Sequence, residues 1–152
     1  MTTVLRARAL VACAGLGSVV LGALLIPPFA VQADEALPAV VHMTSVLNEE
    51  LPLNPITGNR VRGVYRENAG SIAAIQIGDL ARHTHETASE MFYIVDGTAQ
   101  ITVGDVKASV KPGDLMIVPK GALHSIKSDA GLLKAILITM PARDAADVHF
   151  VK

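Results

Sequence analysis

From Arg60 onward the chain is a series of short apolar runs, and this pattern restricts the fold more than any other feature of the sequence. The runs are rich in β-branched residues and occupy positions 61–65, 71–77, 90–95, 99–103, 106–110, 114–118, 124–128 and 132–139. Glycine or aspartate turns separate them, as at Asp96-Gly97 and Gly104-Asp105. Many short strands at close spacing with such turns predict an all-β fold, either a sandwich or a barrel.

The N-terminal region has the pattern of a secretory signal peptide. Two arginines precede an apolar run over residues 9–26, and a stretch ending in small residues follows at 30–33. This pattern predicts a signal peptide over residues 1–33, cleaved after Ala33. The mature protein would be periplasmic or secreted, with no stable membrane insertion after cleavage. An uncleaved membrane anchor is the alternative, although the run is near the lower limit for spanning a bilayer and a proline pair ends it.

Residues 34–152 would then form the mature chain. The only cysteine is Cys13, so the mature chain could form no disulfide. It holds all fourteen acidic residues but only eleven of the thirteen basic ones, which gives a formal charge of −3. Because it has no basic patch and few aromatic residues, nucleic acid is not an expected partner.

The mature chain is expected to form one domain with an irregular segment at each end. Three prolines predict an irregular N-terminal arm over residues 34–59, with one turn of helix near 44–50. The β domain would cover residues 60–140, followed by a tail over 141–152 that forms a short helix or a loop. The oligomeric state stays open, and the arm could join two copies in a homodimer.

One segment carries side chains that can bind a metal. His83 and His85 are two residues apart, so in a strand they project from the same face. Glu90, Phe92 and Ile94 likewise share a face of the next run, which places an inward Glu90 above packed apolar residues. A pair of histidines at a sheet edge is the alternative interpretation of the His-x-His spacing.

Two motifs in this region resemble those of the cupins, and the resemblance covers about residues 60–140. The first cupin motif combines Gly, His-x-His, Glu and Gly, and the second combines Gly, Pro-x-Gly, His and Asn. The corresponding residues here are Gly78, His83, His85, Glu90 and Gly97, then Gly113, Pro119, Gly121 and His124. The sequence departs in two places, because Gly78 is one residue closer to His83 than usual and Ser128 stands at the asparagine position. Neither position is a metal ligand in the family.

The resemblance implies a cupin double-stranded β-helix, or jelly-roll barrel, of two antiparallel sheets with one divalent transition metal ion inside. By their positions in the motifs, the metal ligands would be His83, His85, Glu90 and His124. Three neutral imidazoles and one carboxylate suit Fe, Mn, Ni, Cu or Zn, and they leave positions open for water or substrate. A protein that acquires its metal outside the cytoplasm would favour zinc or copper on affinity.

The resemblance does not select one reaction. Cupins with this ligand set include dioxygenases, decarboxylases, isomerases and lyases, so the first hypothesis is a metal-dependent enzyme acting on a small organic molecule. The second hypothesis is a non-catalytic extracytoplasmic protein that binds a metal or a small ligand. A structural dimer module, in which the metal serves only stability, is the third. No catalytic residue beyond the metal ligands is assigned.

Alternation along the runs also predicts where other side chains point. An apolar pocket beside the metal is expected to have walls formed by Ile75, Ile77, Phe92, Ile94, Ile117 and Ile126. Glu86 and Tyr93 are expected to point away from the metal. Surface roles are expected for three arginines that could otherwise anchor a substrate carboxylate, namely Arg60, Arg62 and Arg66. His149 lies outside both motifs, and no role is expected for it.

Overall fold

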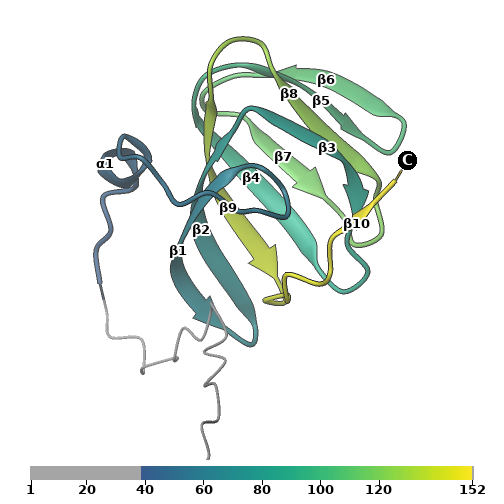
Figure 1. The fold of residues 1–152 in the computed structure, drawn as a ribbon, viewed down its shortest axis with the longest axis horizontal. Helices are drawn as coiled ribbons and strands as arrows, with labels where there is room; N and C mark the ends of the chain where they lie inside the picture. The colour runs from purple at the N-terminus through teal and green to yellow at the C-terminus, as the bar shows by residue number, and fades with distance from the viewer. Residues whose placement is uncertain (1–38, 152) are drawn as a thin grey trace, which may run out of the picture. The chain divides into compact units, whose positions relative to one another are not determined.

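The computed structural model describes residues 39–151, which form two antiparallel β-sheets (Figure 1). Sheet A has the strand order β1-β2-β9-β4-β7, and sheet B has the order β10-β3-β8-β5-β6. The strands are β1 (Arg60–Glu67), β2 (Gly70–Ile77), β3 (Asp79–Thr84), β4 (Ser89–Asp96), β5 (Ala99–Val103), β6 (Val106–Val110), β7 (Leu115–Val118), β8 (His124–Ser128), β9 (Leu133–Met140) and β10 (His149–Phe150). A short helix, α1 (Met43–Leu47), precedes them. Within the described part of the chain, no helix has the length and apolar character needed to cross a membrane.

The two sheets confirm the predicted all-β class, and eight of the ten strands lie on the predicted apolar runs. The other two strands are β3 and β10. The sequence of β3, Asp-Leu-Ala-Arg-His-Thr, has no sustained apolar run that would mark it. β10 is only two residues long and pairs with His83 and Thr84 of β3. The C-terminal tail, for which a short helix or loop was expected, therefore ends as an edge strand of sheet B.

Apolar side chains from both sheets meet between them and form the main core. Phe92 and Ile94 of β4 face inward from sheet A, and Ile126 of β8 faces inward from sheet B. Burial of each such side chain contributes roughly 1.5–3 kcal/mol relative to exposure. Five of the six residues expected as pocket walls belong to this core, namely Ile75, Ile77, Phe92, Ile94 and Ile126.

The prediction for Ile117, the sixth expected wall residue, was wrong, because its side chain is 57% exposed on the outside of sheet A. Opposite residues of an antiparallel pair share a face, and Glu90 and Phe92 lie opposite Val118 and Met116. Met116 and Val118 are therefore the inward residues of β7, and both are buried. The sequence of β7, Leu-Met-Ile-Val, has no polar residue that would mark its outer face.

The described part of the N-terminal arm packs on the outer face of sheet A. Leu47 and Leu51 are buried against Ala74 of β2, and they form a second, smaller apolar cluster. The side-chain amide of Gln76 donates hydrogen bonds to the carbonyls of Leu47 and Glu49, at 2.9 and 2.8 Å. These contacts attach the arm to the barrel without bringing it into the core.

Neighbouring residues of β4 test the assignment of its two faces. Phe92 is 1% exposed and Tyr93 is 44% exposed. Phe92→Ala should lower the free energy of unfolding by about 3–5 kcal/mol, because it leaves a cavity in the core. Tyr93→Ala is the matched control and should cost about 1 kcal/mol or less. Urea denaturation of both variants measures the difference, and equal losses would contradict the assigned faces.

Candidate metal centre

Three strands and one turn bring the predicted ligands together. His83 lies near the end of β3, directly opposite His124 at the start of β8. Glu90 enters from β4 in sheet A, and His85 lies in the turn that follows β3. The peptide N–H of Gly121 donates to the carbonyl of His85 at 2.8 Å, so the second motif supports the first. Gly121 has a φ of +79°, a conformation that favours glycine.

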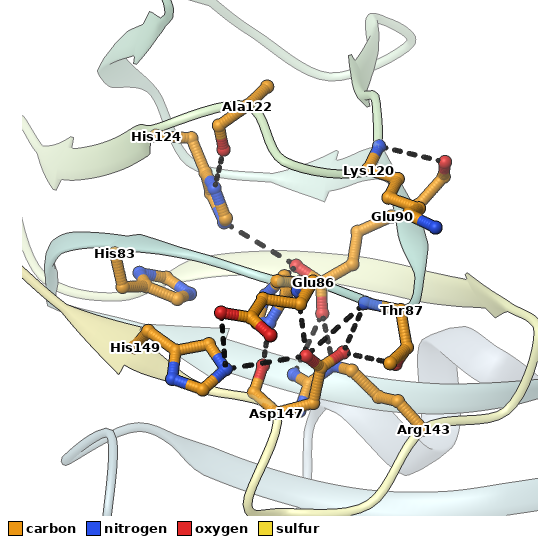
Figure 2. Close-up of polar contacts among 12 residues, drawn as sticks. His83, Glu86, Thr87, Glu90, Lys120, Ala122, His124, Arg143, Asp147 and His149 are labelled. Atoms are coloured by element: carbon orange, nitrogen blue, oxygen red, sulfur yellow. Dashed lines mark hydrogen bonds and ion pairs between the residues drawn. The ribbon is translucent and has the colours of Figure 1, made fainter.

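The four side chains form one buried cluster, and Figure 2 labels His83, Glu90 and His124 among its members. His83, His85, Glu90 and His124 are each only 1–2% exposed. One ligand atom from each residue can be chosen so that all four lie within 4.8 Å of one another. The structure therefore places every predicted site residue in one small volume, between sheets A and B.

The Nδ1 atom of each histidine contacts a backbone carbonyl. His83 contacts the carbonyl of Ala81 at 2.8 Å, and His124 contacts that of Ala122 at 3.1 Å. The carbonyl of Asp147 is the partner of His85. Because a carbonyl can only accept, each Nδ1 must carry the hydrogen. In the neutral rings, each Nε2 is therefore left with a free lone pair.

These lone pairs face further acceptors instead of donors. The Nε2 atoms of His85 and His124 lie 3.1 and 3.5 Å from Oε2 of Glu90. Both Nε2 atoms are buried, and neither has a hydrogen-bond partner. Buried acceptors that face one another are unfavourable unless a cation lies between them. Three imidazole nitrogens and one carboxylate are a donor set that fits a divalent transition metal ion, so the residues present could hold one.

Burial and neighbouring charges set the protonation states of two residues in the cluster, and these states favour cation binding. The pKa of His83 is lowered to about 4, mainly by burial. The neighbouring His124 and His85 also lower this pKa, and the Ala81 carbonyl and Glu90 oppose the shift. Burial alone would raise the pKa of Glu90. The positive charge of Arg143, which donates to Oε1, acts the other way, and the pKa of Glu90 lies well below its usual range. Near neutral pH, His83 is therefore neutral and Glu90 is an anion.

Two residues of the C-terminal tail belong to the centre, and sequence reasoning missed both. The Nη2 and Nε atoms of Arg143 donate to Oε1 of Glu90, at 2.9 and 3.3 Å. The carboxylate of Asp147 accepts from the peptide N–H of Glu86 at 2.7 Å and from the Thr87 hydroxyl at 2.6 Å (Figure 2). Both residues follow the second motif by about twenty positions, and no periodic pattern in the tail marks them.

The remaining predicted side chains lie away from the four ligands. Glu86 is exposed, and Tyr93 is on the outer face of sheet A, both as expected. The three arginines form ion pairs on the surface: Arg60 with Glu50, Arg62 with Glu49 and Arg66 with Asp144. His149 has more contacts than expected, because its Nε2 lies 3.6 Å from Asp147 and 4.0 Å from Glu86.

The lowered pKa of His83 predicts how stability changes with pH. Between about pH 4 and 6.5 the unfolded chain binds a proton at His83 that the folded chain does not. The free energy of unfolding should therefore fall as the pH is lowered through this window, by on the order of 3 kcal/mol from His83 alone.

Urea denaturation at a series of pH values, with a chelator present, measures this effect. His83→Gln removes the titrating ring and should flatten the dependence between pH 4 and 6.5. An unchanged pH dependence in the variant would contradict the burial argument.

Comparisons with known proteins agree with this architecture. The family model described as "Cupin domain" matches residues 73–139. The protein MJ1618 of Methanocaldococcus jannaschii is 27% identical over 120 residues, which covers 78% of this chain and 91% of that protein.

Solved structures show the same fold at low sequence identity. A conserved double-stranded β-helix protein from Klebsiella pneumoniae has a TM-score of 0.59 and 13% identity, covering 76% of this chain and 99% of that one. A variant of Streptomyces PAC13 with uridine has a TM-score of 0.56 and 15% identity, covering 63% and 80%. The chain spans 64% of the solved Schizosaccharomyces pombe Cnp3 cupin-domain chain. The family match identifies a cupin domain over residues 73–139, and the two antiparallel sheets and these solved structures show the same fold.

Proposed function

We propose that this protein is a metal-dependent enzyme that acts on a small organic molecule at the cluster of His83, His85, Glu90 and His124. One observation carries the proposal. Buried acceptor atoms converge on one point, and the Nε2 atoms of His85 and His124 have no hydrogen-bond partner there. A polar cluster of this kind is costly in a core unless it binds something.

Each residue has a distinct part in this proposal. The three imidazoles would hold the metal through Nε2, with their rings fixed by the Nδ1 contacts to backbone carbonyls. Glu90 would bind through Oε2, since Arg143 already contacts its other oxygen. A divalent metal held there would supply Lewis acidity toward a substrate oxygen or a water molecule.

The surroundings favour chemistry that depends on the metal over protein acid–base catalysis. Among the described residues, Asp147 is the one buried acidic residue besides Glu90. Its carboxylate oxygens already accept hydrogen bonds from Glu86 and Thr87. Glu86 itself is exposed. Dioxygenase, decarboxylase and lyase types fit such a centre. The structure of PAC13 with uridine supports a small molecule as the ligand class.

A second candidate function follows from how deeply the centre is buried. Its four side chains are 1–2% exposed, which favours retention of an ion over exchange of substrates. A non-catalytic protein that binds a metal or a small ligand outside the cytoplasm is therefore the alternative. The predicted signal peptide, residues 1–33, lies outside the described residues, and export remains part of the proposal. Metal acquired after export would be zinc or copper, because sites of this kind bind these ions more tightly than manganese or iron.

Metal content tests the centre itself. Purified protein, loaded with Zn²⁺ and then dialysed, should retain one ion per chain by elemental analysis. His85→Ala should lose the ion, because it removes one of the four ligands and leaves the coordination geometry of the metal incomplete. His42→Ala is the matched control, since His42 is exposed in the N-terminal arm. Equal metal content in the wild type and both variants would contradict the assignment.

Turnover separates the two candidate functions. Metal-loaded protein is mixed with a panel of small carboxylates, diketones and thiols, and oxygen uptake and product formation are recorded. Consumption of any substrate by the wild type, lost in His85→Ala, supports the enzyme. Tight binding of panel members without product, seen by calorimetry, would favour the binding protein.

A further inference from the structure

The C-terminal residues 141–151 return to the metal centre, and we name them the latch. The latch leaves the end of β9 and crosses to sheet B, where it ends at β10 (Figure 1). On the way it passes the cluster, as the positions of Arg143, Asp147 and His149 in Figure 2 show. The following inference rests on the proposed metal site, and it concerns what the latch does for that site.

The latch contacts three of the four predicted ligands. Arg143 donates two hydrogen bonds to Oε1 of Glu90. The backbone carbonyl of Asp147 is the partner of the Nδ1 atom of His85. β10 pairs with β3 at His83, and the ring of Phe150 lies 5.5 Å from the His83 ring, measured between centroids.

The carboxylate of Asp147 fixes the latch to the turn that carries His85. It accepts from the peptide N–H groups of Glu86 and Thr87 and from the Thr87 hydroxyl. Asp147 is 8% exposed, whereas Asp144, three residues earlier in the latch, has a 94% exposed side chain. The buried aspartate thus orders the latch and the His85 turn together.

The latch has fewer backbone hydrogen bonds to the rest of the domain than the long barrel strands have to their neighbours. At the C-terminal end of the latch, β10 has two residues, both exposed, and one further hydrogen bond joins the Val151 N–H to the Arg82 carbonyl at 3.1 Å. Near the start of the latch, Arg66 donates two exposed hydrogen bonds to the Arg143 carbonyl, both at 3.2 Å. Segments with few buried contacts open at lower free energy than the whole domain unfolds. Since the four ligands are almost fully buried, an ion can exchange with solvent only if a covering segment moves.

We propose that the latch controls metal retention, with Arg143 and Asp147 as positioning residues for Glu90 and His85. Arg143 keeps one oxygen of Glu90 turned away, so that Oε2 faces the histidines. Asp147 fixes the ring plane of His85 and keeps the latch closed. Opening of the latch is then the step that limits metal loss.

The test measures metal release from full-length protein loaded with Co²⁺, with excess chelator added at time zero. The variants Arg143→Gln and Asp147→Asn should each weaken affinity by about 10–100-fold. Asp147→Asn should act mainly by faster release. The control for Asp147→Asn is Asp144→Asn, the same substitution at an exposed latch position. The control for Arg143→Gln is Arg62→Gln, which breaks only a surface pair with Glu49.

Further readouts separate positioning from general destabilisation. Arg143→Lys should recover part of the lost affinity, because it restores a positive charge beside Glu90. The visible spectrum of bound Co²⁺ should change in Arg143→Gln but not in Arg62→Gln. Thermal melting with chelator present shows whether each variant still folds as the wild type does.

The outcomes distinguish this inference from the proposed metal site. If the wild type binds one Co²⁺ ion and the latch variants release it at the wild-type rate, the latch inference is wrong while the site stands. If the wild type binds no Co²⁺, both are wrong. Release that is faster in the latch variants than in Asp144→Asn and Arg62→Gln, at equal melting temperature, supports the latch.

Discussion

The structure depends on the hydrogen bonds that fix three imidazole rings against backbone carbonyls. Each bond assigns the ring hydrogen to Nδ1 and so turns an unshared Nε2 lone pair toward the same interior point. Glu90 adds a carboxylate oxygen to that point. The result is a buried set of acceptors without a donor, which costs stability unless a cation binds. This single constraint explains why the four side chains are suited to holding a metal ion.

The same centre joins the two sheets. Glu90 belongs to β4 of sheet A, whereas His83 and His124 belong to β3 and β8 of sheet B. A metal bound by these side chains would therefore link the sheets across the core. If the predicted signal peptide is removed, the chain has no cysteine, and such a link would do part of what a disulfide does in many exported proteins. The tail adds to this link, since it runs from sheet A to sheet B over the ligands.

Much of the fold and of the ligand set could be predicted, because both depend on local patterns. The β-branched runs and their glycine turns mark eight strands, and the spacing of His83, His85, Glu90 and His124 matches two motifs. The face of Ile117 could not be predicted, because four consecutive apolar residues in β7 give no alternation, and pairing with β4 decides the matter. Arg143 and Asp147 could not be found either. Their roles arise from contacts with residues more than fifty positions away, and such contacts leave no local pattern in the tail.

We propose that His83, His85, Glu90 and His124 bind one metal ion between the sheets. Anomalous diffraction from crystals grown with Zn²⁺ tests it most directly, because it locates the ion without assuming its ligands. The proposed site predicts one strong peak at about 2.0–2.2 Å from the three Nε2 atoms and from Oε2 of Glu90. A peak confined to surface groups, with the four side chains unchanged and no density between them, would contradict it.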